Sequence, residues 1–527
     1  MPETLRSFET VFQLALTAVR NGNVPLAAQL FGEAVAIDPG HAPAHCNLGV
    51  ALAELRQFAG ALASYDRAVA LNPDYAVAHS NRGNAQRELG RSEAALASLE
   101  RAIAINPEFA QAYLNRGRVL QQLARWDEAL ADYDRALAID PELVQAHSNR
   151  GMVLRELNQF AAALESYDRA IALDPGSAES YLNRGVLLTA LKRMDLAKAS
   201  YNKAIAVRPN FARAYFNRAV TSLLTGDFEN GWIDYEWRWQ CEDEPDCAGR
   251  RDFRQPLWLG AESLAGRTIL LHGEQGLGDT LQFCRYAKPA ANRGARVILE
   301  VQRPLAGLLP NLEGVSQIVA RGDALPNFDF HCPLMSLPLA FKTRIATVPS
   351  AARYLEADAE RTSRWRARLA AATSPCIGLA WSGSATNRAD RYRSVPLVDL
   401  AERLPPQFRY VSLHKHLNER DRDTLRATDI LDFSAEQDDF CDAAALCECM
   451  DLVISVDTSL AHLSAALGGE TWILLSDRHD WRWLLDRVDS PWYPTVSLYR
   501  QESSGDWGGV LDRVAADLLE KFPAPRR

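Results

Sequence analysis

Residues 108–141 read EFAQAYLNRGRVLQQLARWDEALADYDRALAIDP, and the same 34-residue pattern recurs before and after this stretch. Proline ends a helix because it lacks the backbone donor and clashes with the preceding turn. A fixed period of this length predicts a tandem array of helix pairs, each too small to bury its apolar face alone. We therefore expect the copies to stack and their concave side to form a long binding surface. The prolines that mark the period are Pro39, Pro73, Pro107, Pro141, Pro175 and Pro209.

Small and large residues recur in the same register. A small residue lets two helices approach closely, and a large side chain fills the space beside it. The array resembles the tetratricopeptide family across residues 8–240, with a degenerate first copy at residues 8–41. The seventh copy ends in Tyr235-Glu236-Trp237-Arg238-Trp239, and these aromatic residues predict a cap that docks onto another domain. The small residues are Gly49, Gly83, Gly117, Gly151, Gly185 and Ala219, and the large ones are Tyr65, Leu99, Tyr133, Tyr167, Tyr201 and Tyr235.

An asparagine precedes each small residue by two positions. A side-chain amide carries both a donor and an acceptor, so a row of amides can hold a peptide backbone without reading its sequence. The pattern resembles the asparagine ladder of protein O-GlcNAc transferases. The alternative is that these amides bond locally between helices. The candidates for binding a protein acceptor are Asn81, Asn115, Asn149, Asn183 and Asn217, with Asn47 in the degenerate copy.

Composition limits the remaining classes. The chain has 527 residues, enough for at least two domains, and a net charge of −9 that argues against general nucleic-acid binding. We infer no membrane span and no secretion signal, because long apolar runs are missing. Cys441, Cys447 and Cys449 lack the paired spacing of a metal site, so a buried helix face is the preferred interpretation. A reduced, cytoplasmic location fits these features.

After Trp239 the period is lost, and residues 241–265 are expected to form a linker. Beyond it, short apolar runs alternate with helical segments, including a helix expected at 280–291. Such alternation predicts parallel sheets with helices on both faces. We expect two Rossmann-like halves, at residues 266–352 and 353–527, after an all-α tetratricopeptide superhelix at 1–240. The runs expected as strands are 268–272, 296–300, 317–320, 328–332, 376–381, 408–413, 451–456 and 470–475.

Three turns carry residues that suit chemistry. Gly273 to Asp279 follows the first strand, and its glycines let the backbone approach a ligand. Ser382-Gly383-Ser384 follows the first strand of the second half. Asp457 to Gly468 opens a helix, where Thr458 and Ser459 suit an N-terminus that can receive an anion. His462 lies one helical turn beyond Thr458, on the same side.

Residues 266–500 resemble the heptosyltransferase-type family of GT-B glycosyltransferases, family 9. Gly278-Asp279-Thr280-Leu281 is similar to the turn whose aspartate is the family's base. Asp457-Thr458-x-x-x-His462-Leu463 is similar to the nucleotide-sugar loop. Arg393, three residues before Pro396, stands where the family carries a basic residue for the donor phosphates, usually a lysine. Ser459 departs from the family's frequent glycine, so the identity of the sugar stays open.

The resemblance implies an inverting transfer in which Asp279 takes the proton of the acceptor hydroxyl. For Asp279 the alternative is a helix cap, and for His462 it is a core histidine. Arg482 lies between two tryptophans and is expected either to pack or to touch the donor. The turns lack a DxD motif, so we expect no metal and no cofactor beyond the nucleotide-sugar. The donor residues implied are Gly383, Arg393, Asp457, Thr458, Ser459 and His462.

The complete layout is similar to bacterial flagellin-modifying glycosyltransferases, which transfer nonulosonic sugars to protein hydroxyls. We therefore expect an enzyme that modifies Ser or Thr of a protein held by the superhelix. Two alternatives stay open at this point. One is a scaffold whose α/β part has lost activity, and the other is transfer to a lipid or saccharide, with the repeats serving assembly.

Overall fold

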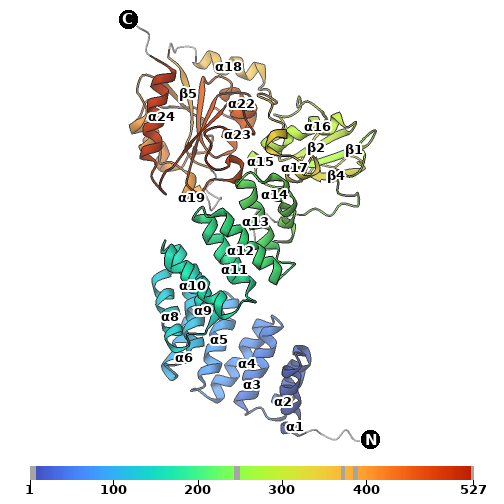
Figure 1. Ribbon diagram of the computed structural model, residues 1–527, viewed down its shortest axis with the longest axis vertical. Coiled ribbons are helices and arrows are strands. Elements are labelled where there is room, and N and C mark those ends of the chain that lie inside the picture. The colour runs from blue at the N-terminus through green and yellow to red at the C-terminus, as the bar shows by residue number, and fades with distance from the viewer. Residues whose placement is uncertain (1–6, 242–249, 370–373, 384–389, 524–527) are drawn as a thin grey trace. The chain divides into compact units, whose positions relative to one another are not determined.

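The computed structural model describes residues 7–241, 250–369, 374–383 and 390–523 (Figure 1). The chain forms two compact units, Met1–Asn210 and Phe211–Arg527. The division falls before the seventh copy of the repeat, so that copy belongs to the second unit. It thereby differs from the boundary at residue 240 that the 34-residue period predicts.

The first unit is a tetratricopeptide superhelix of stacked helix pairs, drawn from dark blue to blue-green in Figure 1. Each second helix ends just before its proline, as expected: α8 ends at Ile139, Asp140 follows as the C-cap, and Pro141 comes next. The helices are α1 (Phe8–Arg20), α2 (Val24–Ile37), α3 (Ala42–Glu54), α4 (Phe58–Leu71), α5 (Ala76–Glu88), α6 (Ser92–Ile105), α7 (Ala110–Gln122), α8 (Trp126–Ile139), α9 (Val144–Glu156), α10 (Phe160–Leu173), α11 (Ala178–Ala190) and α12 (Met194–Val207).

The predicted contact between small and large residues is confirmed. A Cβ atom added to Gly117 would lie 2.6 Å from Cε1 of Tyr133, which is closer than packed carbon atoms approach. The Tyr133 ring is fully buried. The close approach of the Tyr133 ring therefore requires glycine at position 117.

The second unit begins with α13 (Ala212–Leu224), α14 (Phe228–Tyr235) and the 3₁₀ helix η1 (Glu236–Gln240). A four-stranded parallel sheet follows in the order β3-β2-β1-β4. Its strands are β1 (Thr268–His272), β2 (Arg296–Val301), β3 (Val315–Ala320) and β4 (Phe330–Pro333), all close to the predicted runs. The helix expected at 280–291 is instead divided into α15 (Leu277–Phe283), η3 (Cys284–Tyr286) and α16 (Ala287–Asn292).

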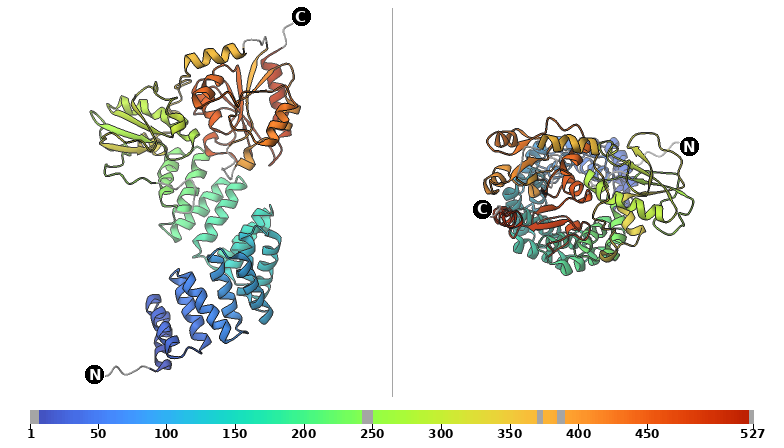
Figure 2. Two further views of the ribbon diagram at one scale, coloured as in Figure 1. Left: turned by 180° about the vertical axis from the view of Figure 1, so that it is seen from behind. Right: turned by 90° about the horizontal axis from the view of Figure 1, so that it is seen from above.

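The second sheet has six parallel strands in the order β10-β9-β8-β5-β6-β7. Figure 1 shows α24 (Gly508–Lys521) on one face and α22 (Phe440–Cys447) with α23 (Ser459–Ala466) on the other, and Figure 2 shows the same layers from behind. Together with the first sheet, it gives two Rossmann-like halves. The strands are β5 (Cys376–Ala380), β6 (Arg409–Ser412), β7 (Leu431–Asp432), β8 (Leu452–Val456), β9 (Thr471–Leu475) and β10 (Val496–Arg500), and the other helices are α17 (Leu337–Ala340), α18 (Ala359–Leu369), α19 (Asp390–Arg393), α20 (Leu397–Arg403) and α21 (Glu419–Arg426).

Aromatic residues explain why the seventh copy joins the second unit. Trp232 of α14 donates its indole N–H to the carbonyl oxygen of Thr343 at 3.1 Å. The Trp232 ring also packs edge-on against Trp481, with ring centres 5.2 Å apart. Phe228 packs against Trp492 at 6.0 Å. The predicted docking of this cap is confirmed, and it reaches both Rossmann-like halves.

The expected linker is only partly described, because residues 242–249 lie outside the described ranges. The described remainder packs on the first sheet. Trp258 is fully buried, and its backbone N–H donates to the carbonyl oxygen of His331 in β4 at 2.8 Å. This part of the expected linker therefore belongs to the first α/β half.

Candidate functional site

The strand order of the second sheet reverses between β5 and β8. The chain steps outward from β5 through β6 to β7, and then returns to β8 on the other side of β5. Ligands of open parallel sheets bind at the carboxyl ends of the strands at such a reversal. Gly383 follows β5, while Asp457 and Thr458 follow β8. The structure thus places these predicted donor residues together at the reversal point.

The first sheet reverses in the same way between β1 and β4. The predicted turn from Gly273 to Asp279 leaves β1 at this point, and α15 begins within it at Leu277. One carboxylate oxygen of Asp279 accepts from the backbone N–H of Gly276 at 2.8 Å. Asp279 is therefore not the N-cap that the alternative interpretation expects: Gly276 is the N-cap, and Asp279 is the third helical residue, which reaches back to it. The other oxygen faces Arg482 in an ion pair.

The two reversal points lie against each other within the second unit. A Cβ atom added to Gly278 would lie 2.9 Å from Cδ2 of His462 and 3.6 Å from the Cα atom of Ser459. Since both contacts come from α23, the turn of the first half touches the helix that follows β8. Glycine at 278 is what permits this approach.

His462 has the contacts of a packed histidine. Its Nδ1 atom lies 2.9 Å from the Tyr493 hydroxyl, and its ring stacks on Trp483 with centres 5.4 Å apart. Burial, followed by the positive charges of Arg482, Arg285 and Arg393, lowers the pKa of His462 well below its usual value. The ring is therefore neutral near pH 7 and brings no positive charge to a phosphate.

Arg482 joins acidic groups from both halves. It is buried, and it forms an ion pair with Asp279 and another with Asp480 at 2.8 Å. Its Nε atom donates to the side chain of Gln282 at 2.8 Å. Burial, and then repulsion from Asp480, raises the pKa of Asp457 to about 6. From the sequence, Arg482 is expected either to pack or to touch the donor. In the structure it forms an ion pair with the candidate base, Asp279.

Arg393 is held beside Gly383 by a residue that the sequence analysis missed. Asp390 accepts from Nε of Arg393 at 3.0 Å and from the backbone N–H of Gly383 at 2.8 Å. Its second oxygen accepts from the hydroxyl of Ser394 at 2.9 Å. Ser384 of the predicted turn lies in the segment 384–389, outside the described residues. The sequence signal for these hydrogen bonds is an aspartate three residues before a basic residue at the start of a helix.

Thr458 is the N-cap of α23, and its hydroxyl lies 3.2 Å from that of Ser455. The first backbone N–H groups of α23 lack partners within their own helix, as at every helix start. Together with the Arg393 guanidinium, these groups are suited to an anion at the carboxyl ends of β5 and β8.

The asparagines of the array have local partners. Asn115 donates to the hydroxyl of Ser80 in the preceding copy at 3.1 Å, and it is nearly buried. Asn183 lies 3.5 Å from the hydroxyl of Ser148, and Asn81 lies 3.9 Å from the sulfur of Cys46. These contacts agree with the alternative of local bonds between helices. Contact of Asn149 and Asn217 with an acceptor, like that of the other three, stays a prediction.

The arginine after each of these asparagines also has a structural role. Arg116 binds Asp132 in a bidentate pair, at 2.8 and 2.6 Å, across the two helices of one copy. Arg150 reaches Ser166 at 2.8 Å in the equivalent position. This contact between the two helices has a signal in the sequence, namely a serine or aspartate 16 residues after the arginine.

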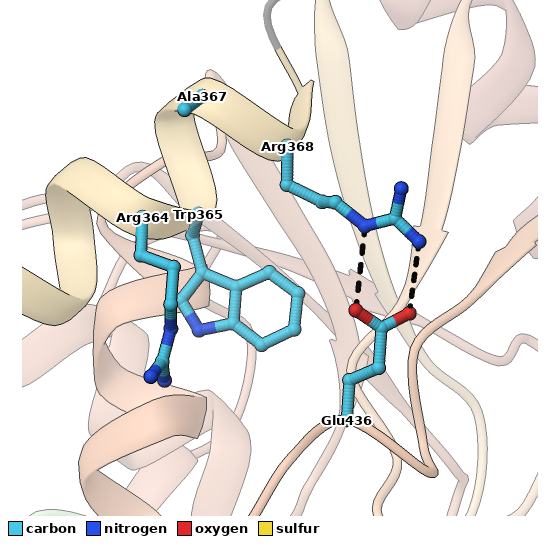
Figure 3. Close-up of a pocket in the computed structure, with 5 residues that line it drawn as sticks. All are labelled: Arg364, Trp365, Ala367, Arg368 and Glu436. Atoms are coloured by element: carbon cyan, nitrogen blue, oxygen red, sulfur yellow. Dashed lines mark hydrogen bonds and ion pairs between the residues drawn. The ribbon is translucent and has the colours of Figure 1, made fainter.

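Three further features limit other kinds of site. Within the described residues, no group of three or more His, Cys, Asp or Glu side chains could hold a metal ion. Cys441 and Cys447 are buried in α22, as the interpretation of a helix face expects, whereas Cys449 lies beyond the end of α22 and is half-buried. A cavity of about 350 Å³ opens beside α18, where Arg368 pairs with Glu436, and none of the predicted site residues lines it (Figure 3).

Across the described part of the chain, no helix is both long and apolar enough to cross a membrane.

Comparisons with known proteins bear mainly on the helical array. Tetratricopeptide-repeat models match residues 12–76, 64–97, 83–124, 108–176 and 149–206, so this region carries tetratricopeptide repeats. Protein FlbA of Caulobacter vibrioides is 25% identical over 333 residues, which is 57% of this chain and 54% of that protein. The chain thus spans about half the length of this curated relative.

Solved structures are also similar to part of the chain. YrrB, described as a TPR protein with an unusual peptide-binding site, is 26% identical with a TM-score of 0.29, over 36% of this chain and 97% of its own. The Cut9–Hcn1 hetero-tetramer of the APC/C is 17% identical with a TM-score of 0.39, over 41% of this chain and 43% of that one.

Proposed function

We propose that this chain is a GT-B glycosyltransferase that moves a sugar from a nucleotide-sugar to Ser or Thr hydroxyls of a protein. The observation that carries the proposal is the meeting of two reversal points. Each sheet presents its predicted turn at the place where parallel sheets bind ligands. The turn with Asp279 touches the helix that begins at Thr458.

The second half supplies groups for the donor. The leaving phosphate needs positive charge and donors, and Arg393 with the first amides of α23 offers both. Asp457 is close to these groups, and its ionised carboxylate would accept a hydrogen bond from a hydroxyl group of the ribose or the sugar. Because its pKa is about 6, the ionised form dominates above about pH 6.

The first half supplies the base. Asp279 would take the acceptor proton as the nucleotide leaves, so that the sugar is transferred with inversion. A positioned base contributes roughly a factor of 10²–10⁴ in rate. The ion pair with Arg482 and the hydrogen bond from the Gly276 N–H hold the carboxylate in one orientation.

The repeats supply the acceptor contact. Tetratricopeptide arrays have the capacity to bind proteins along their concave side. We propose that a protein acceptor of the flagellin type lies there and that the sugar is nonulosonic. The donor chemistry itself would proceed without a metal ion, because Arg393 and the α23 amides take over the charge stabilisation.

A second candidate is a scaffold without catalytic activity. It is favoured by the two contacts of Asp279, since a carboxylate that accepts from Gly276 and pairs with buried Arg482 is a weaker base than an unpaired one. This candidate binds proteins but turns over no nucleotide-sugar.

Transfer and binding, measured side by side, separate the candidates. Purified protein is incubated with nucleotide-sugars and flagellin. Nucleotide release is recorded, and mass spectrometry of the flagellin shows whether a sugar has been attached. We expect the wild type to release nucleotide and the Asp279→Asn variant to lose turnover at least about 100-fold while it still binds nucleotide. Normal turnover in Asp279→Asn would remove the base assignment, and turnover by neither protein, with intact protein binding, would favour the scaffold.

A further inference from the structure

The seventh repeat is bound to the candidate base's own turn through a buried ion pair. Arg238 of η1 is 1% exposed, and its Nη2 atom lies 3.0 and 3.1 Å from the two carboxylate oxygens of Glu274. The same guanidinium donates to Glu236 at 2.7 Å and to Ser336 at 2.8 Å. Glu274 is the second residue of the turn that ends at Asp279.

Stacking fixes the direction of the guanidinium. Its central carbon lies 4.9 Å from the ring centre of Tyr235 and 4.3 Å from that of Trp239. A buried ion pair contributes little net stability compared with apolar residues of the same size. What such a pair does supply is a defined geometry, because a planar guanidinium and a carboxylate bind in few orientations.

The same repeat also contacts the other side of the candidate site. The side chain of Gln275 lies 3.4 Å from the Tyr235 hydroxyl, which adds a second contact to the turn. Trp481, the neighbour of Arg482 in sequence, packs against Trp232 and Tyr235. The last repeat thus contacts both the turn that carries Asp279 and the tryptophan next to Arg482 in sequence.

We propose that Arg238 is a positioning residue, which holds the turn between β1 and α15 through Glu274 and so orients Asp279 for transfer. The inference rests on the proposed function. It also gives the last repeat a role in the reaction beyond that of an end cap.

The charge of Glu274 adds a pH dependence. Burial raises the pKa of Glu274 to about 7, because it outweighs the attraction of Arg238 and the hydrogen bond from it; repulsion from Glu236 and Asp279 adds smaller upward effects. The thiol of Cys332 on β4 is a further titratable group that interacts electrostatically with Glu274. As the pH falls through about 7, Glu274 takes up a proton and the charged pair with Arg238 weakens.

The test compares two changes to the pair with a matched control. Glu274→Gln keeps the shape and removes the charge, whereas Arg238→Met leaves a buried carboxylate unpaired. The control is Asp234→Asn, because Asp234 is similarly buried and pairs with Arg218 at 2.6 Å in the same repeat. Hydrogen exchange of the amides at 275–280 reports on the turn without any need for activity.

We expect both changes to the pair to cause a loss of protection at 275–280 and a fall in kcat of about 10- to 100-fold, with nucleotide affinity retained. The control is expected to keep both protection and kcat. The double variant Arg238→Met with Glu274→Gln is expected to regain part of the stability but not turnover, since the buried Glu274 carboxylate is gone and Glu236 keeps its hydrogen bonds from Ser336 and Trp239. The wild type is expected to lose turnover as the pH falls from 8 to 6, because Glu274 takes up a proton. This loss should be smaller in Glu274→Gln, which has no carboxylate to protonate.

Unchanged protection and unchanged kcat in Glu274→Gln would overturn the proposal, as would recovery of turnover in the double variant. If Arg238→Met does not fold, the nearly isosteric Glu274→Gln variant decides alone. If the wild type releases no nucleotide, the proposed function has failed, and hydrogen exchange still decides whether the pair holds the turn.

Discussion

Replacing Asp457 with asparagine should stabilise the second unit at neutral pH and have little effect in acid. The carboxylate lies at the carboxyl end of β8, where its side chain is 17% exposed. Burial, and then repulsion from Asp480, raises its pKa from 3.8 to about 6. In the unfolded chain Asp457 ionises near 3.8, whereas in the folded protein it keeps its proton up to about pH 6.

The magnitude follows from this difference. Each pKa unit corresponds to about 1.4 kcal/mol, so a shift of roughly two units destabilises the folded state by about 3 kcal/mol above pH 7. The penalty starts near pH 4, grows as the pH rises to about 6, and is then constant. Asparagine has no charge to bury, so Asp457→Asn removes the penalty where the wild type carries it.

Urea unfolding from pH 4 to pH 8, followed by tryptophan fluorescence, measures the effect. Trp126 is the one tryptophan before residue 211, so the signal reports mainly on the second unit. Asp442→Asn is the control of opposite sign. Burial opposes ionisation of Asp442, but the N–H of Asp438 and the charges of Arg361 and Arg364 outweigh it and lower its pKa. That variant should be destabilised at pH 8, and the difference should shrink in acid. If Asp457→Asn changes the stability equally at pH 4 and pH 8, the buried charge of Asp457 does not destabilise the folded protein.

Two further predictions concern the array. Gly117→Ala should destabilise the first unit by about 1–3 kcal/mol in urea titrations followed by circular dichroism, because the new methyl group meets the Tyr133 ring. Gly60→Ala is its control, since the nearest atom is an ordinary contact at 3.4 Å, and it should stabilise α4 by up to about 1 kcal/mol; equal effects of both changes would argue against the packing account. Alanine at all five acceptor asparagines should abolish capture of a protein acceptor, at about 1 kcal/mol per amide, while donor hydrolysis survives. Normal modification of the acceptor would show that the amides serve only the array, and the residues concerned are Asn81, Asn115, Asn149, Asn183 and Asn217.

Local patterns allowed most of the fold to be predicted. The 34-residue period fixes the helix pairs, and the apolar run at 268–272 is the strand β1. The helix expected at 280–291 is divided because Pro289 cannot donate to the ladder and crowds the carbonyl of Arg285. The strand β10 (Val496–Arg500) was missed because it lies at a sheet edge, where its residues alternate between buried and half-exposed. A continuous apolar run is the signal of a strand buried on both faces.

The candidate site was predictable only in its local parts. Glycines and acidic residues in short turns after strands indicate where a sheet binds its ligand. They do not indicate which residues these turns contact. The partners of those turns are distant in sequence: Asp279 and Arg482 are 203 residues apart. Arg238 reaches Glu274 from a repeat that the period alone assigns to the array. Such pairs depend on how the elements pack, and a single sequence carries no signal for them.

Calorimetry with nucleotides and nucleotide-sugars tests whether the carboxyl ends of β5 and β8 hold a donor. The account predicts that at least one nucleotide binds the wild type and that Arg393→Ala weakens it about 10- to 100-fold, because a hydrogen bond to a charged group contributes about 1.5–3 kcal/mol. Arg403→Ala, on the exposed end of α20, should bind like the wild type. Absence of binding across the panel, or equal affinity of Arg393→Ala and the wild type, would contradict the account.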